Sequence, residues 1–160
     1  MIRAWMLIAL LLGGCAGQSP LPAGQPDLKL PRQLHVVRTQ ADQRQDWLLI
    51  IQRETTGLRW SMMDPLGIPL ARQRLIQNQW QADGLLPPNP EARELFAALI
   101  FAMTADAELS DRYPAAVRQG IQRRLADRWL VEYQSADAFT VRLKDGLQYE
   151  VTPLNSEPAP

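Results

Sequence analysis

Residues 95–103 read LFAALIFAM, nine residues without a polar side chain in the second half of a 160-residue chain. Asn89 and Pro90 precede this run, and these residue types are favoured at the N-cap and at the first position of a helix. One stripe of the predicted helix holds Leu95, Phe96, Leu99, Ile100 and Met103. A helix that is apolar nearly all round must be enclosed by protein or lipid, and this stretch is too short to cross a membrane.

Alternating apolar and polar residues predict antiparallel strands on both sides of this helix. Before it we expect strands at 33–40, 46–54 and 58–62, and one long or two short strands over 68–81. After it we expect a weaker helix over 111–122, interrupted at Pro114 and Gly120, and strands at 128–133, 139–144 and 147–152. Turn residues separate these strands at 55–57, 64–67 and 145–146. The order predicts an α+β protein that is mainly β.

The composition excludes several classes of protein. With 17 basic and 17 acidic side chains the formal charge is zero, which argues against a nucleic-acid-binding protein. One cysteine and one histidine exclude an internal disulfide, a thiolate zinc cluster and a multi-histidine metal site. The common hydrolase, metalloprotease and phosphate-loop motifs are missing, so we expect no catalytic residues. An enzyme, the alternative, would need a polar cleft around His35.

The first fifteen residues predict an exported lipoprotein. Arg3 is followed by nine apolar residues at 4–12, a length typical of a signal peptide. Leu12-Gly13-Gly14-Cys15 resembles the lipobox of bacterial lipoproteins. The resemblance implies cleavage after residue 14, a diacylglyceryl group on the Cys15 thiol and an acyl group on its new amine, with no other cofactor. In the Gram-negative lipoproteins that this start resembles, Ala16 implies an outer-membrane location facing the periplasm. The alternative is an ordinary signal peptide with an incidental cysteine.

The remaining chain divides into three parts. Residues 15–32 combine the lipidated cysteine with four prolines and two glycines, which predicts an extended tether that holds the domain away from the membrane. Residues 33–152 form the predicted domain, and residues 153–160 read as a flexible tail.

One segment is similar to a known family. Residues 58–67, LRWSMMDPLG, resemble the strand and Asp-Pro-Leu-Gly turn of the outer-membrane lipoprotein receptors of the LolA/LolB superfamily, and the last three predicted strands fall where that family has its closing strands. A nearer resemblance is to uncharacterised LolB-like lipoproteins encoded beside aryl-polyene and fatty-acid-like synthesis clusters. The resemblance implies an unclosed antiparallel β-barrel with helices plugging its concave side. It also implies a loop, here Leu66 with Ile68, that transfers cargo to the membrane.

These expectations define a candidate site and function. The predicted acyl-chain cavity is lined by apolar side chains of the strands and of the central helix: Trp47, Leu49, Ile51, Trp60, Met62, Leu70, Leu95, Phe96, Leu99, Ile100 and Met103. We expect a monomer that binds acyl chains or lipidated cargo and helps to deliver it to the outer membrane, with a LolA-like periplasmic carrier as partner and no nucleic acid.

Two alternatives stay open at this point. The same apolar residues can simply fill a core, in which case the protein is a structural or assembly lipoprotein and Leu66 is only a turn residue. Arg123, Arg124 and Arg128 form a basic patch in the sequence, which is either a solvated face or a contact for lipid headgroups or an acidic carrier.

Overall fold

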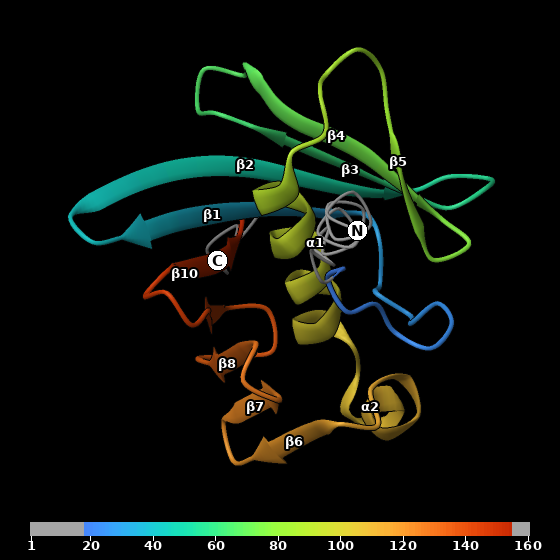
Figure 1. Ribbon diagram of the computed structural model, residues 1–160, viewed down its shortest axis with the longest axis vertical. Coiled ribbons are helices and arrows are strands. Elements are labelled where there is room, and N and C mark those ends of the chain that lie inside the picture. Colours follow the sequence, from blue (N-terminus) through green and yellow to red (C-terminus); the bar gives the residue numbers. More distant parts are fainter. Residues whose placement is uncertain (1–17, 155–160) are drawn as a thin grey trace, which may run out of the picture.

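One antiparallel sheet of ten strands curves around a central helix in the computed structural model, which describes residues 18–154 (Figure 1). The chain forms β1 (Arg32–Gln40), β2 (Gln43–Arg53), β3 (Leu58–Met63), β4 (Pro69–Ile76) and β5 (Gln79–Ala82), then α1 (Pro90–Met103) and α2 (Asp106–Arg112). It ends with β6 (Ala116–Gln119), β7 (Gln122–Leu125), β8 (Trp129–Tyr133), β9 (Phe139–Arg142) and β10 (Gln148–Pro153). The expected mainly β, α+β class is confirmed.

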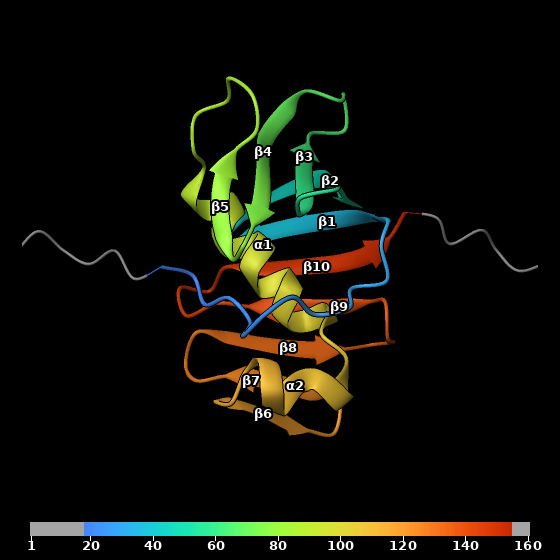
Figure 2. The ribbon, with the colours of Figure 1, turned by 90° about the vertical axis from the view of Figure 1, so that its right-hand side faces the viewer.

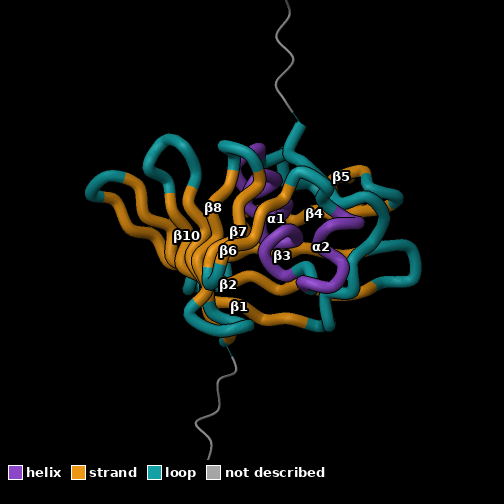
Figure 3. The backbone as a smooth tube through the Cα atoms, turned by 90° about the horizontal axis from the view of Figure 1, so that it is seen from below, coloured by secondary structure: helices purple, strands orange, loops and turns teal. Residues whose placement is uncertain are grey.

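The first and last strands join the two halves of the sheet. The spatial order is β5-β4-β3-β2-β1-β10-β9-β8-β7-β6, so β1 lies between β2 and β10, and Val36 pairs with Val151. The edge strands β5 and β6 do not pair with each other, and the sheet stays open within residues 18–154. Seen from below, the sheet curves around the helices and leaves one side uncovered by strands (Figure 3).

The helix α1 is enclosed as its sequence predicts. The Asn89 side chain accepts a hydrogen bond from the backbone nitrogen of Ala92 at 3.0 Å, and Pro90 occupies the first turn. Every residue from Leu95 to Ala102 is buried. Several of these are alanines, which leave room for the large side chains that the sheet contributes, above all Trp60 and Trp129.

Most predicted strands are confirmed, and residues 68–81 form two of them. The β4–β5 turn is made by Gln77 and Asn78, both with positive φ, which is the backbone conformation of a tight hairpin turn. The residue types of Asp145 and Gly146 also predicted a turn, and Gly146 has positive φ there.

The helix predicted over residues 111–122 is wrong. The short helix α2 lies earlier, at 106–112, and it ends just before Pro114, which has no N–H to continue it. Residues 116–125 instead form the hairpin β6–β7, with Gly120 at positive φ in its turn. The alternation of β7 was hidden because one of its two inward residues is an arginine, Arg123.

Residues 18–31, which we call the strap, pack against the domain instead of extending from it. The strap crosses in front of α1 on the side that the sheet leaves open (Figure 2). Its side chain Leu28 is buried in the main core, and Leu21 packs against that core. The Asn78 amide donates to the carbonyl of Pro22 at 2.7 Å, and Arg112 donates to the carbonyl of Ala23 at 2.8 Å. The folded unit therefore begins well before residue 33.

The far end of the domain also extends past its predicted limit. The strand β10 runs to Pro153, and the backbone nitrogen of Leu154 donates to the carbonyl of Gln33 at 2.9 Å.

Candidate functional site

The space between α1 and the sheet holds most of the predicted cavity residues. Nine of the eleven are buried in one shared core: Trp47, Leu49, Ile51, Trp60, Met62, Leu95, Phe96, Leu99 and Ile100. They come from β2 and β3, whose inward positions alternate with outward ones, and from α1. The sequence therefore identifies a set of residues that the fold does bring together.

The other two predicted residues lie at the margin. Leu70 is half-buried because the inward positions of β4 are Ala71, Gln73 and Leu75, one residue out of phase with it. The regular pairing of Trp60 with Gln73 and of Met62 with Ala71 sets this phase, and the register shifts only beyond it, between Met62 and Met63. Met103 ends α1 and is half-buried beside a surface pocket.

Aromatic side chains fill this interior. Trp60 of β3 stacks on Phe96 of α1 with ring centroids 5.1 Å apart, and Trp80 of β5 contacts both rings at 6.0 and 5.8 Å. Further along α1, Phe101 packs against Trp129 and Tyr113 at 5.7 and 5.0 Å. Five surface pockets occur over residues 18–154, and Trp60 and Phe96 line none of these five.

One surface pocket reaches the edge of the interior. It has a volume of about 610 Å³ and lies between the strap, β5 and the first turn of α1. Trp80 is part of its wall and is also the outer member of the Trp60–Phe96–Trp80 cluster. The Trp80 side chain therefore separates the pocket, which we call the Trp80 pocket, from the interior.

Polar groups fix the N-terminal half of α1 to the sheet. The Glu91 carboxylate accepts hydrogen bonds from Arg38 at 2.5 Å and from the Tyr149 hydroxyl at 2.9 Å. Arg93 donates to the side chain of Gln73, a buried polar residue of β4, at 2.9 Å. These contacts attach the helix to both halves of the sheet.

Glu94 makes the densest set of these contacts. Its carboxylate accepts two hydrogen bonds from Arg128, at 2.7 and 2.6 Å, one from the Trp129 indole at 2.7 Å and one from Ser19 of the strap at 2.5 Å. Burial acts to raise the pKa of Glu94, but these hydrogen bonds outweigh it and hold the pKa below its ordinary value.

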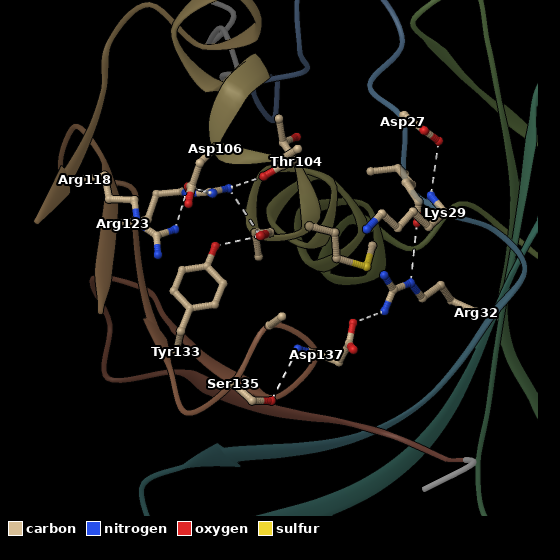
Figure 4. A pocket seen from close by; sticks show the side chains of 15 residues that line it. Asp27, Lys29, Arg32, Thr104, Asp106, Arg118, Arg123, Tyr133, Ser135 and Asp137 are labelled. Atoms are coloured by element: carbon tan, nitrogen blue, oxygen red, sulfur yellow. Dashed lines mark hydrogen bonds and ion pairs between the residues drawn. The ribbon is translucent and has the colours of Figure 1, made fainter. Parts of the chain in front are cut away.

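Arg123 and Tyr133 satisfy the C-terminal end of α1 (Figure 4). Arg123 is only 2% exposed, and one of its terminal nitrogens donates to the carbonyls of Phe101 and Thr104 at 2.7 and 2.8 Å. The Tyr133 hydroxyl donates to the carbonyl of Ala102 at 2.6 Å. The last carbonyls of a helix have no partner within it, so these side chains supply the missing donors.

The basic patch expected from the sequence does not form as one surface. Arg123 points inward to α1, Arg128 pairs with Glu94, and only Arg124 of the three is exposed. Successive residues of a strand face opposite sides of the sheet, which separates Arg123 from Arg124.

The predicted transfer loop is a rigid turn with an exposed apolar tip. The Asp64 carboxylate accepts hydrogen bonds from the backbone nitrogens of Leu66 and Ile68 at 2.9 and 2.8 Å, and Gly67 has positive φ. Leu66 is 86% exposed and Ile68 is 56% exposed. A residue that the sequence did not single out, Leu85, is fully exposed in the loop between β5 and α1. Both loops lie at the upper end of the molecule in Figures 1 and 2.

The predicted signal peptide and the predicted lipidation site Cys15 lie outside the described residues. Over residues 18–154, none of the helices combines the length and the apolar character that crossing a membrane requires. Comparison with models of known protein families finds no match for this chain, and comparison with curated proteins finds no significant match either.

Proposed function

We propose that this chain is a lipoprotein of the outer membrane that binds acyl chains between α1 and the curved sheet and delivers them to the membrane. The lipobox-like start of the sequence supports the anchor, and the resemblance of residues 58–67 to the LolA/LolB superfamily supports the fold family and the role. The observation that carries the proposal is the Trp80 pocket, because it places an external volume of about 610 Å³ directly against an apolar interior.

Ligand entry requires α1 to move relative to the sheet. The interior is already filled by side chains, so an acyl chain gains space only when the Trp60–Phe96–Trp80 cluster separates. The hydrogen bonds of Glu91, Arg93 and Glu94 oppose this movement in the first half of the helix, and those of Arg123 and Tyr133 oppose it at the C-terminal end. We place the opening at the first half of α1, because that half borders the Trp80 pocket.

Delivery to the membrane would use the exposed apolar loops. A rigid turn that holds Leu66 away from the protein suits insertion into the acyl region of a membrane, since each buried CH₂ contributes about 0.8 kcal/mol. The loop between β5 and α1, which holds the exposed Leu85, lies at the same end of the molecule in Figure 1 and would add apolar surface to that contact.

The filled interior favours a second candidate, a structural or assembly lipoprotein of an envelope complex. In that case the aromatic cluster is an ordinary core, which is how closely packed apolar side chains usually act. The two candidates differ in one measurable property, because only the first requires the interior to open to an acyl chain.

The test uses the chain from residue 16 onward, which contains every contact described above. Native mass spectrometry after purification without detergent detects a bound acyl ligand, and titration with an environment-sensitive fatty-acid probe measures its affinity. We expect a bound mass of acyl size that the probe displaces. Trp80→Glu, at a half-buried position that tolerates the change better than the fully buried Trp60, should abolish probe binding.

A second variant tests the opening step. Glu94→Gln weakens the attachment of α1 and should increase the affinity for the probe by about tenfold, since hydrogen bonds to a charged group contribute about 1.5–3 kcal/mol. Glu150→Gln, an exposed glutamate of β10, is the matched control. A clean ligand-free mass with no probe binding by the unaltered chain or by Glu94→Gln would exclude the acyl-binding function and favour the second candidate.

A further inference from the structure

A second pocket lies at the opposite end of α1 from the Trp80 pocket. It has a volume of about 450 Å³ and is formed by the strap, the α1–α2 junction, β6 and the loop after β8 (Figure 4). This size falls in the range of small-molecule sites. The contacts of Glu91, Arg93 and Glu94 that hold the first half of α1 do not form its wall.

The base of the pocket is built from buried, closely packed groups. Arg123 lines it and is fixed by the carbonyls at the end of α1. The guanidinium carbons of Arg118 and Arg123 lie 5.1 and 5.4 Å from the centre of the Tyr133 ring. The Nε atom of Arg123 is buried and has no hydrogen-bond partner among the described residues. Two guanidinium groups are therefore held side by side before any ligand binds.

The positive charge of the pocket exceeds its negative charge. Arg118 and Arg123 both bind the same carboxylate oxygen of Asp106, each at 2.6 Å, so two cations share one anion. Arg32 pairs with Asp137. Among residues 18–154, the ammonium group of Lys29 has no carboxylate within ion-pair distance. The wall of the pocket therefore holds four cations and three carboxylates, namely Lys29, Arg32, Arg118 and Arg123 with Asp27, Asp106 and Asp137.

The remaining wall is apolar. Leu28 of the strap, Ala102 and Met103 of α1 and Ala136 of the loop after β8 contribute to it. A pocket of this kind combines an anion-binding side with a surface for hydrocarbon. We propose that it binds an anionic amphiphile, with a carboxylate or phosphate headgroup held between Lys29 on one side and the guanidinium groups of Arg118 and Arg123 on the other (Figure 4), and an apolar portion against Leu28 and Met103.

The test measures binding to the chain from residue 16 onward, which contains every residue of the pocket, so that neither the covalent lipid nor the apolar segment at 4–12 is itself a ligand. The probes are octyl phosphate, octanoate, octanol and inorganic phosphate, titrated by calorimetry at low ionic strength. We expect both charged amphiphiles to bind more tightly than octanol and more tightly than inorganic phosphate. The binding should weaken as salt is added, because it depends on exposed charges.

Charge variants then locate the site. Lys29→Gln and Arg118→Gln should each weaken octyl phosphate binding by about tenfold, whereas Arg44→Gln, an exposed arginine at the other end of the β1–β2 hairpin from Arg32, should leave it unchanged. Asp137→Asn releases Arg32 and should tighten binding several-fold, an increase that a purely structural role of these residues does not produce.

Each other result overturns the proposal. Octanol binding as tightly as octanoate, or equal affinity in Lys29→Gln and the unaltered chain, would mean that the amphiphile binds elsewhere. If inorganic phosphate bound as tightly as octyl phosphate, the apolar wall would contribute nothing to binding and the ligand would not be an amphiphile. A failure of this pocket is distinguishable from a failure of acyl binding at α1, because Glu94→Gln affects only the latter.

Discussion

The indole nitrogen of Trp129 donates to the Glu94 carboxylate over 2.7 Å, which joins α1 to β8 across the inner face of the sheet. Arg128 and Ser19 bind the same carboxylate, so one acidic group connects the helix, the sheet and the strap. A carboxylate with this many donors contributes to stability only while it is ionised, and it makes the attachment of α1 dependent on pH.

Replacing Glu94 by Gln should lower the free energy of unfolding by about 1.5–3 kcal/mol at neutral pH, because charge-assisted hydrogen bonds to Arg128 are lost. The folded pKa of Glu94 lies below its ordinary value of 4.5, so its contribution is complete above that pH and is lost as the pH falls through the folded pKa. Urea denaturation of both chains as a function of pH measures this. An identical acid dependence in Glu94→Gln would contradict it.

Folding should protect the three tyrosine hydroxyls from ionisation at high pH. Burial raises the pKa of Tyr133 to about 12 and raises the pKa values of Tyr113 and Tyr149 still further, and these are all the tyrosines of the sequence. A raised folded pKa means that stability is complete below the ordinary value of 10.0 and is lost as the pH rises through the folded pKa. Tyrosinate absorbance should therefore appear together with unfolding. Ionisation near pH 10 in a chain that still has native circular dichroism would refute this.

Arg123 should be more important for stability than any exposed arginine. Arg123→Met leaves the carbonyls at the end of α1 without donors and Asp106 without its buried partner, so we expect a loss of about 3–5 kcal/mol. Its neighbour Arg124 faces solvent, and Arg124→Met should change stability by less than about 0.5 kcal/mol. Thermal denaturation of the two variants compares the two faces of β7, and equal melting temperatures would argue against the assigned role.

Tyr133→Phe isolates one of these contacts. It removes the hydroxyl that donates to Ala102 but keeps the ring beneath Arg118 and Arg123, so the expected cost is about 1 kcal/mol. A cost as large as that of Arg123→Met, measured in the same denaturation experiment, would mean that the ring contacts have been disturbed as well.

The aromatic cluster should behave as a core in the absence of ligand. Phe96→Ala removes the ring that stacks on Trp60 and should cost about 3–5 kcal/mol, whereas Leu85→Ala in the exposed loop should be nearly neutral. The fluorescence of Trp60 and Trp80 should shift to longer wavelength in Phe96→Ala as water reaches the rings. An unshifted spectrum would indicate that the cavity collapses or stays dry.

Periodic segments were predictable from the sequence, and segments fixed by distant contacts were not. The sequence of α1 predicts a buried helix because nine apolar residues come shortly after Asn89 and Pro90. The alternation around Trp60 predicts a strand. The strand β7 was missed because Arg123 occupies one of its inward positions, which breaks the expected alternation. The charge of Arg123 is satisfied by a carbonyl of α1, which lies 22 residues earlier in the sequence.

The strap was missed for a different reason. Its buried residues, including Pro22, Pro26 and Leu28, show no period because the segment forms no regular secondary structure. Its position depends instead on the burial of Leu28 and on hydrogen bonds with Asn78 and Arg112, whose locations only the tertiary structure defines. The phase of Leu70 was likewise not predictable, since the pairing of Ala71 with Met62 in the neighbouring strand determines which positions of β4 face inward.

If Cys15 carries the proposed lipid, the docked strap also determines how far the domain can stand from the membrane. Three residue steps separate Cys15 from Gln18, a reach of about 10 Å in extended chain, so the docked state keeps the domain beside the bilayer surface. Release of the strap up to Arg32 would increase the extended length between Cys15 and the folded domain to about 60 Å. The hydrogen bonds of residues 18–31 and the burial of Leu28 would then decide between two distances of the domain from the membrane.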